Sequence, residues 1–209
     1  MSTQKSEKII KTYEQAIEQN YKEIFPISYN DNRILLMCQL LTERSEHVQL
    51  FLNKNDFDKM YPYLSCFSEY FPEKIKGLSL IVTRDVLANE KLTQAMPFKT
   101  DEHFNETHPL ISALPYAENI RILDWGQDER IPSFILFDEQ YLVQIPDDNK
   151  FLCCLNPYAS TSKYKRLNLL QENFEIITEE SVPFSPQLVE SYHLNLMDLV
   201  RQNNHINSQ

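Results

Sequence analysis

Apolar residues recur at helical spacing from the beginning of the chain. Ile10, Tyr13, Ile17 and Tyr21 lie on one stripe of a helix whose other faces are polar or charged. Pro26 removes a backbone donor and ends such a helix. The pattern therefore predicts an amphipathic N-terminal helix within residues 1–26.

The next segment switches between helical and alternating patterns. Residues 34–41 are spaced as a helix, and the alternate positions Val48, Leu50 and Leu52 are apolar as in a strand. Residues 57–71 are again helical, after a cap at Asn55 or Asp56, and 78–82 form a short apolar run after a glycine. The order helix, strand, helix, strand predicts a parallel unit.

The remaining chain predicts an antiparallel meander followed by helices. Residues 86–96 have a helical pattern and 120–123 a strand pattern, and three closely spaced strands follow at 131–137, 141–145 and 151–155. A helix is expected to end near residue 171, with a last strand at 174–177. Ser185 and Pro186 then open an amphipathic helix over 185–202.

These elements predict one α/β (α+β) domain over residues 1–209. It would have a mixed sheet, an antiparallel meander in the C-terminal half and amphipathic helices at both ends. No repeat or Pro/Ser-rich linker marks a domain boundary.

Composition excludes several classes of function. The net charge of -10 opposes a phosphate backbone and so disfavours direct nucleic-acid binding. Gly77 and Gly126 are the only two glycines, too few for a Walker loop or a dinucleotide fingerprint, and no cofactor is expected. No apolar run approaches the roughly 18 residues that span a bilayer, so a cytoplasmic protein with no membrane contact is expected. The four cysteines read as reduced core residues.

Two polar clusters resemble catalytic or metal sites at first sight. His103 and His108 lie in an acidic stretch but are five residues apart, which misses the helical spacing for two zinc ligands. Asp138 with Asp148-x-Lys150 resembles the acids and lysine of a restriction-type nuclease, but residues 146–150 read as a hairpin turn. We therefore assign no catalytic residue and no metal ligand.

One loop combines the features of a binding site. Residues 124–130 join a predicted strand to the meander and contain the single tryptophan, a glycine and four charges. Loops at strand ends often carry function. A lid of Trp125 over the core is the competing interpretation. The candidate binding residues are those of this loop together with one aspartate of the first hairpin: Asp124, Trp125, Asp128, Arg130 and Asp138.

The segment Arg121-Ile-Leu-Asp and the hairpin 131–145 resemble the strand and hairpin that carry the H-x-K-x4-D motif of the phospholipase D superfamily. The resemblance covers residues 34–160. With Asp138 at the aspartate position, Ile131 replaces the histidine and Ser133 the lysine. It implies a degenerate half-domain without phosphodiesterase activity, because the nucleophile is missing. It also implies pairing with a second half, as a homodimer or with a partner protein.

The absent motifs favour a non-catalytic binding or regulatory protein of a bacterial or mobile-element system. It would act through a protein partner. A basic partner would suit its acidic surface, because opposite charges attract across an interface. An immunity protein, an antitoxin or a defence-system accessory subunit fits equally. One alternative is a metal-dependent hydrolase or nuclease built from Asp124, Asp128, Glu129, Asp138 and Asp148. Another is an acidic mimic of nucleic acid.

Overall fold

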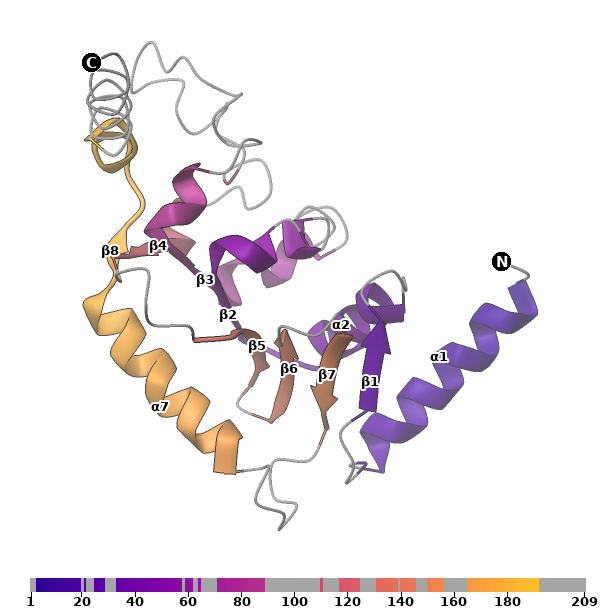
Figure 1. Ribbon diagram of the computed structural model, residues 1–209. Helices are drawn as coiled ribbons and strands as arrows, with labels where there is room; N and C mark the ends of the chain where they lie inside the picture. The colour runs from indigo at the N-terminus through magenta and orange to yellow at the C-terminus, as the bar shows by residue number, and fades with distance from the viewer. Residues whose placement is uncertain are drawn as a thin grey trace, which may run out of the picture.

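The fold is described from a computed structural model of the 209-residue chain. The described residues are 3–19, 21, 25–28, 33–57, 59–61, 64, 71–88, 110, 117–124, 131–138, 140–145, 150–155 and 165–191. Within them a mixed sheet forms the centre, with helices on both of its faces (Figure 1). The predicted α/β class is confirmed.

The sheet contains eight strands among the described residues, in the order β1-β7-β6-β5-β2-β3-β4-β8. The neighbours β2, β3 and β4 are parallel, and every other pairing is antiparallel. The predicted parallel unit and the predicted meander, β5-β6-β7, are therefore both confirmed. The strands are β1 (Phe25–Ser28), β2 (Val48–Leu52), β3 (Leu78–Thr83), β4 (Ile120–Leu123), β5 (Ser133–Phe137), β6 (Tyr141–Ile145), β7 (Lys150–Cys154) and β8 (Val182–Pro183).

Helices α1, α2 and α7 and several short 3-10 turns accompany the strands in the described part of the chain. The helices are α1 (Thr3–Glu18), α2 (Arg33–Glu43) and α7 (Lys165–Glu180), and the 3-10 turns are η1 (Pro72–Gly77), η2 (Arg84–Ala88) and η4 (Ala117–Asn119). Helical residues also follow Asn53, whose side-chain oxygen accepts a hydrogen bond from the Asp56 amide at 3.1 Å. Asn53 is thus the N-cap, rather than the expected Asn55 or Asp56.

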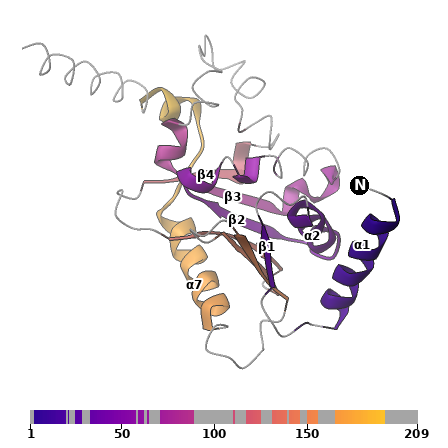
Figure 2. The same cartoon turned by 45° about the vertical axis from the view of Figure 1, so that its right-hand side comes forward.

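Alternation of side chains across the strands creates two cores. Leu50, Leu80 and Ile135 point to the face covered by α1 and α2. Phe51 and Phe134 point to the other face, where Phe174 of α7 packs edge-on against Phe134 with ring centroids 6.2 Å apart. Figure 2 shows α7 on the far side of the sheet from α2. Helices thus cover both faces of the sheet, and the residues beneath them are apolar.

The structure differs from the predicted elements at β1 and at α7. Helix α1 ends at Glu18, and Pro26 lies in β1 instead of stopping a longer helix. β1 is an edge strand, where a missing backbone donor is tolerated. Residues 174–177, predicted as a strand, belong to α7, because Phe174 and Ile177 lie one helical turn apart and enter the same core.

The helices that open and close the chain are partly described. Tyr13 and Ile17 of α1 are buried, as its stripe predicts. The last helix begins at Pro186, and Ser185 Oγ accepts a hydrogen bond from the Leu188 amide at 3.3 Å, which confirms the predicted start. The predicted helix at 86–96 is described only to residue 88, as η2. In the described part of the chain, no helix combines the length and the apolar character needed to cross a bilayer.

Candidate functional site

The two predicted site residues that the structure describes lie at opposite edges of the sheet. Asp124 follows β4 and Asp138 follows β5. Because β5 runs antiparallel to β2, and β2 is parallel to β3 and β4, the ends of β4 and β5 point in opposite directions. The structure therefore does not bring the two carboxylates together. Trp125, Asp128, Glu129, Arg130 and Asp148 lie outside the described residues.

Asp124 lies at the carboxyl edge of the parallel strands. Its Oδ2 forms an ion pair with Nη2 of Arg84 at 3.0 Å, and the Asp124 side chain is 59% exposed. At the same edge, the hydroxyl of Thr83 donates a hydrogen bond to the carboxylate of Asp85. Both described acids at this edge thus already have a protein partner.

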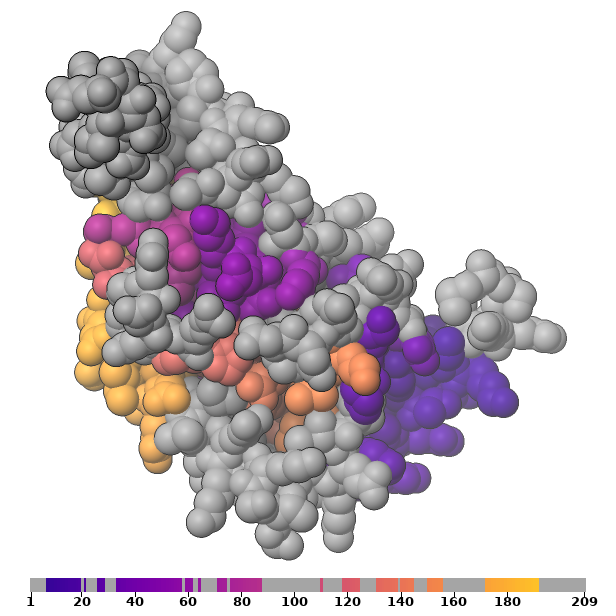
Figure 3. Space-filling model, viewed as in Figure 1, coloured from indigo at the N-terminus to yellow at the C-terminus, as the bar shows by residue number. Residues whose placement is uncertain are grey.

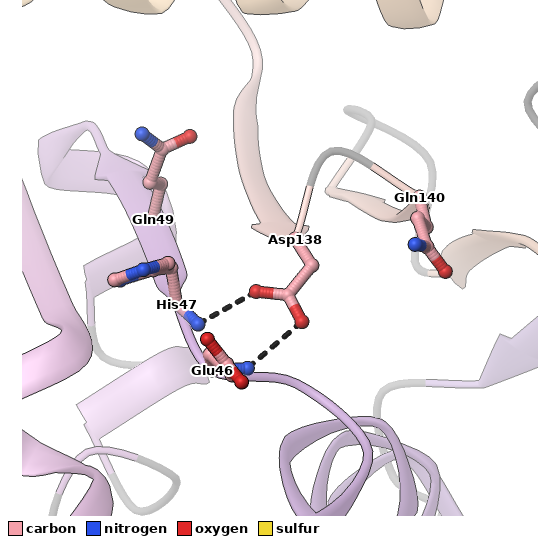
Figure 4. Close-up of a pocket in the computed structure, with 5 residues that line it drawn as sticks. All are labelled: Glu46, His47, Gln49, Asp138 and Gln140. Atoms are coloured by element: carbon pink, nitrogen blue, oxygen red, sulfur yellow. Dashed lines mark hydrogen bonds between the residues drawn. The ribbon is translucent and has the colours of Figure 1, made fainter.

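Asp138 connects two loops at the opposite edge. Its carboxylate oxygens accept hydrogen bonds from the backbone amides of Glu46 at 2.8 Å and His47 at 2.6 Å. The Asp138 amide in turn donates to the His47 carbonyl at 3.0 Å. Figure 4 shows the carboxylate directed at these two amides. Asp138 has a φ of 48°, a left-handed conformation that Asp and Asn tolerate better than most residues.

The α2–β2 loop that Asp138 holds is also fixed from two other directions. Lys74 Nζ donates to the Ser45 carbonyl at 2.6 Å, and Ser45 Oγ donates to the Leu41 carbonyl at 2.7 Å. A Cβ at Gly77 would overlap the Glu46 carbonyl oxygen, so the chain needs glycine there for this close approach. Asp138 is therefore part of a structural clamp around this loop.

A shallow pocket of about 380 Å³ opens beside the clamp, lined by Glu46, His47, Gln49, Asp138 and Gln140 (Figure 4). Both oxygens of Asp138 already accept hydrogen bonds from backbone amides, so its carboxylate has a structural role at this pocket. The pocket's described lining residues include one histidine, and none of them is a serine, cysteine or lysine that could act as a nucleophile. The arrangement suits binding better than covalent catalysis.

A second cavity of about 380 Å³ lies between the sheet and α7, and we call it the α7 groove. Gln49 of β2 and Ser79 and Ile81 of β3 form its floor. Three exposed glutamates line it from two elements, η4 and α7: Glu118, Glu175 and Glu179. Figure 3 shows α7 (orange to yellow) along one flank of the molecule, with α1 (indigo) on the other.

Arg121 of β4 fixes α7 against the sheet. Its Nε donates to Ser181 Oγ at 2.7 Å, and its Nη2 donates to the carbonyls of Ser181 at 2.6 Å and Thr178 at 3.2 Å. Carbonyls in the last turn of a helix lack partners within the helix, so the guanidinium caps α7. These bonds occupy Arg121, which is the one cation among the described residues that line the groove, so its charge stabilises the position of α7.

Sequence reasoning did not identify the groove residues, although a signal was present. Gln49, Ser79 and Arg121 are the second residues of β2, β3 and β4, and each is polar at a position whose flanking residues are apolar. The register pairs Gln49 with Ser79 directly, whereas Arg121 pairs with Ile81. A polar residue at the same place in neighbouring strands marks an uncovered part of a sheet face.

The described cysteines are core residues, as predicted. Cys38, Cys153 and Cys154 are free and buried. Burial raises the pKa of the Cys38 thiol, and the nearby Cys153 raises it further. Burial likewise raises the pKa of Cys153, with a smaller contribution from Cys154. A thiol that stays protonated and inaccessible is a poor nucleophile.

Potential metal ligands lie both inside and outside the part of the chain that the structure describes. Within that part, no group of three His, Cys, Asp or Glu side chains converges to hold an ion. The acidic stretch containing His103 and His108 lies outside the described residues.

Comparison with known proteins identifies no family. The sequence matches no protein-family model and no curated protein. Among solved structures, the fold is similar to TrmBL2, an archaeal chromatin protein that shows a novel mode of DNA binding. The match has a TM-score of 0.44 and 10% identity, and it covers 87% of this chain and 62% of the TrmBL2 chain.

This match corrects one expectation from the sequence. The net charge led us to disfavour direct nucleic-acid binding, yet the matched structure belongs to a DNA-binding protein. Net charge is a sum over the whole surface, whereas binding depends on how charges are distributed on one face. The expectation against nucleic-acid binding is therefore withdrawn. At this TM-score and identity, the match carries no argument for DNA binding by this chain.

Proposed function

We propose that this chain is a non-catalytic binding or regulatory protein that acts through a partner protein. The observation that carries the proposal is the α7 groove, whose three exposed glutamates face a sheet floor that α7 leaves open. Binding sites are usually concave and contain a few polar groups that fix the orientation of what binds. Complementary charge across such a surface accelerates encounter and selects the partner.

The contacts of the two candidate carboxylates that the structure describes support binding over metal-dependent hydrolysis. Asp138 accepts two backbone hydrogen bonds, Asp124 is paired with Arg84, and the two acids lie at opposite edges of the sheet. A hydrolytic metal site needs several carboxylates around one ion. Asp124 and Asp138 therefore do not form such a site.

An immunity protein, an antitoxin and a defence-system accessory subunit all belong to this class of function. Each acts by occupying a surface of one other protein, which requires a preformed complementary surface and no reaction chemistry. The anchoring of α7 by Arg121 makes the α7 groove such a preformed surface.

The test begins with affinity capture of a partner from the native host and ends with the purified pair. The captured protein is produced separately, and its affinity for this chain is measured by calorimetry at two salt concentrations. The proposal predicts a defined stoichiometric complex that weakens as salt rises. Failure of the purified pair to associate, or turnover of a substrate by this chain alone, would contradict it.

We further propose that the fold is a degenerate phospholipase D-like half-domain. Two observations support this: Asp138 ends the first strand of the β5–β6 hairpin, and the parallel pair β2–β3 precedes it. At the positions of the motif's histidine and lysine, Ile131 packs in the second core and Ser133 accepts a hydrogen bond from the Asn53 amide. The proposal predicts no hydrolysis of a chromogenic phosphodiester by the purified chain. Activity that survives in an Asp138→Asn variant would indicate a contaminant, and activity that is lost would contradict the proposal.

A further inference from the structure

The charges that line the α7 groove are unbalanced. Glu118 comes from η4, and Glu175 and Glu179 come from α7, so acids approach the groove from two sides. All three side chains are exposed. Arg121 is the one cation among the described lining residues, and its guanidinium is already bound to the end of α7.

The floor of the groove limits what fits. Ser79 is exposed and small, Gln49 is half-buried, and Ile81 is buried in the core. The volume of about 380 Å³ is near the lower end for ligand sites. Such a space accepts a few side chains of a short segment rather than a folded domain. Lysine and arginine suit it, because their aliphatic stems pack on a partly apolar floor while their charged ends reach the rim.

We propose that the α7 groove binds a short segment rich in lysine and arginine, presented by the partner protein. This inference rests on the proposed function and gives the partner's contact surface its chemistry. The charged ends of the segment would pair with Glu175 and Glu179 on α7 and with Glu118 on the opposite side. Contacts of this kind depend on salt and set the rate of encounter.

The direct test uses a fluorescein-labelled nonalysine peptide, with a nonaglutamate peptide as the blank. Fluorescence anisotropy is measured for the wild type and for the double variant Glu175→Gln/Glu179→Gln. Because each exposed ion pair contributes modestly, the variant is expected to bind nonalysine about fivefold more weakly.

Helix α1 offers a matched control for the charge change. Glu14 and Glu18 lie four residues apart in the last turns of α1, as Glu175 and Glu179 do in α7. The variant Glu14→Gln/Glu18→Gln has the same net charge as the groove variant but changes the other flank (Figure 3). Its affinity for nonalysine is expected to change by less than about twofold. Equal weakening in both variants would overturn the assignment to the groove.

A steric variant tests the groove without changing charge. Ser79 is exposed, so Ser79→Tyr fills the groove and leaves the core intact, which a thermal melt verifies. Nonalysine binding should fall at least about fivefold. Unchanged binding, or no binding by the wild type, would overturn the inference. Groove-dependent binding of a DNA duplex, or a homodimer that dissociates in Ser79→Tyr, would identify a different occupant and overturn it as well.

The reconstituted partner separates this inference from the proposed function. If the purified partner binds Glu175→Gln/Glu179→Gln as tightly as the wild type, the groove assignment fails while the proposed function stands. If no purified partner binds the wild type, the proposed function itself fails.

Discussion

Replacement of Asp138 tests how much the clamp on the α2–β2 loop stabilises the fold. In the wild type, the carboxylate accepts hydrogen bonds from the amides of Glu46 and His47 at 2.8 and 2.6 Å. Asp138→Ala removes both acceptors. Asp138→Asn keeps one acceptor but places an amide donor opposite the second backbone donor. Asp138→Gly removes both acceptors and also removes the cost of the left-handed conformation.

The magnitudes follow from these differences. A hydrogen bond to a charged group contributes about 1.5–3 kcal/mol, and the exposed position of this pair favours the lower value. Asp138→Ala should therefore lose about 3 kcal/mol for the two bonds. Its φ of 48° adds a further cost of about 1 kcal/mol for alanine. Asp138→Asn should lose about 1.5–2 kcal/mol, and Asp138→Gly should be about 1 kcal/mol more stable than Asp138→Ala.

Urea denaturation followed by circular dichroism measures these free energies of unfolding. The expected order of stability is wild type, Asp138→Asn, Asp138→Gly and Asp138→Ala. If all three variants unfold within about 0.5 kcal/mol of the wild type, the clamp contributes nothing measurable and the structural role of Asp138 is refuted. If Asp138→Gly is the least stable, the argument from the left-handed conformation fails.

Three further predictions concern the clamped α2–β2 loop, the wall of the α7 groove and the core. Gly77→Ala should lose about 2–3 kcal/mol in urea denaturation, because the new Cβ overlaps the Glu46 carbonyl oxygen, and a loss below about 0.5 kcal/mol would contradict this. Arg121→Met should lose about 2–3 kcal/mol of stability, because three hydrogen bonds to the end of α7 disappear. Hydrogen exchange of the backbone amides at that end should become faster, and unchanged exchange there would contradict the capping role. Burial raises the pKa of the Cys38 and Cys153 thiols, so the folded protein favours their neutral form. The stability that this preference contributes is fully present below the unfolded thiol pKa of about 8.5. Above that pH, the free energy of unfolding falls by about 1.4 kcal/mol per pH unit for each thiol. Urea midpoints between pH 8 and 10 should therefore fall more steeply in the wild type than in Cys153→Ser, and equal slopes would contradict the raised pKa.

Most of the sheet could be predicted from side-chain alternation. β2 and the strands of the meander contain apolar residues at alternate or consecutive positions between polar turns, which a strand buried on one or both faces requires. The errors at Pro26 and at residues 174–177 arise because tertiary context decides between structures that the local pattern allows equally. Pro26 was taken as a helix stop because its tolerance at a sheet edge depends on strand order. The run 174–177 is short enough to fit either period, and only packing of Phe174 and Ile177 on one core selects the helix.

The site was less accessible to sequence reasoning than the fold. Asp138 was identified as a candidate, but its hydrogen bonds to Glu46 and His47 join residues about ninety positions apart in the chain, which no local pattern encodes. The α7 groove depends on the same kind of long-range pairing. Arg121 and Thr178 meet only because β4 and the end of α7 are neighbours in space. Its polar floor was visible as interruptions of apolar strands, but their alignment required the register.

Hydrogen exchange of the reconstituted complex tests the central claim most directly. The account predicts that the purified partner protects the backbone amides of residues 173–181 and of β3, which surround the α7 groove, and that this protection weakens in high salt. Protection confined to α1, or a complex whose formation leaves the α7 groove unprotected, would contradict the account.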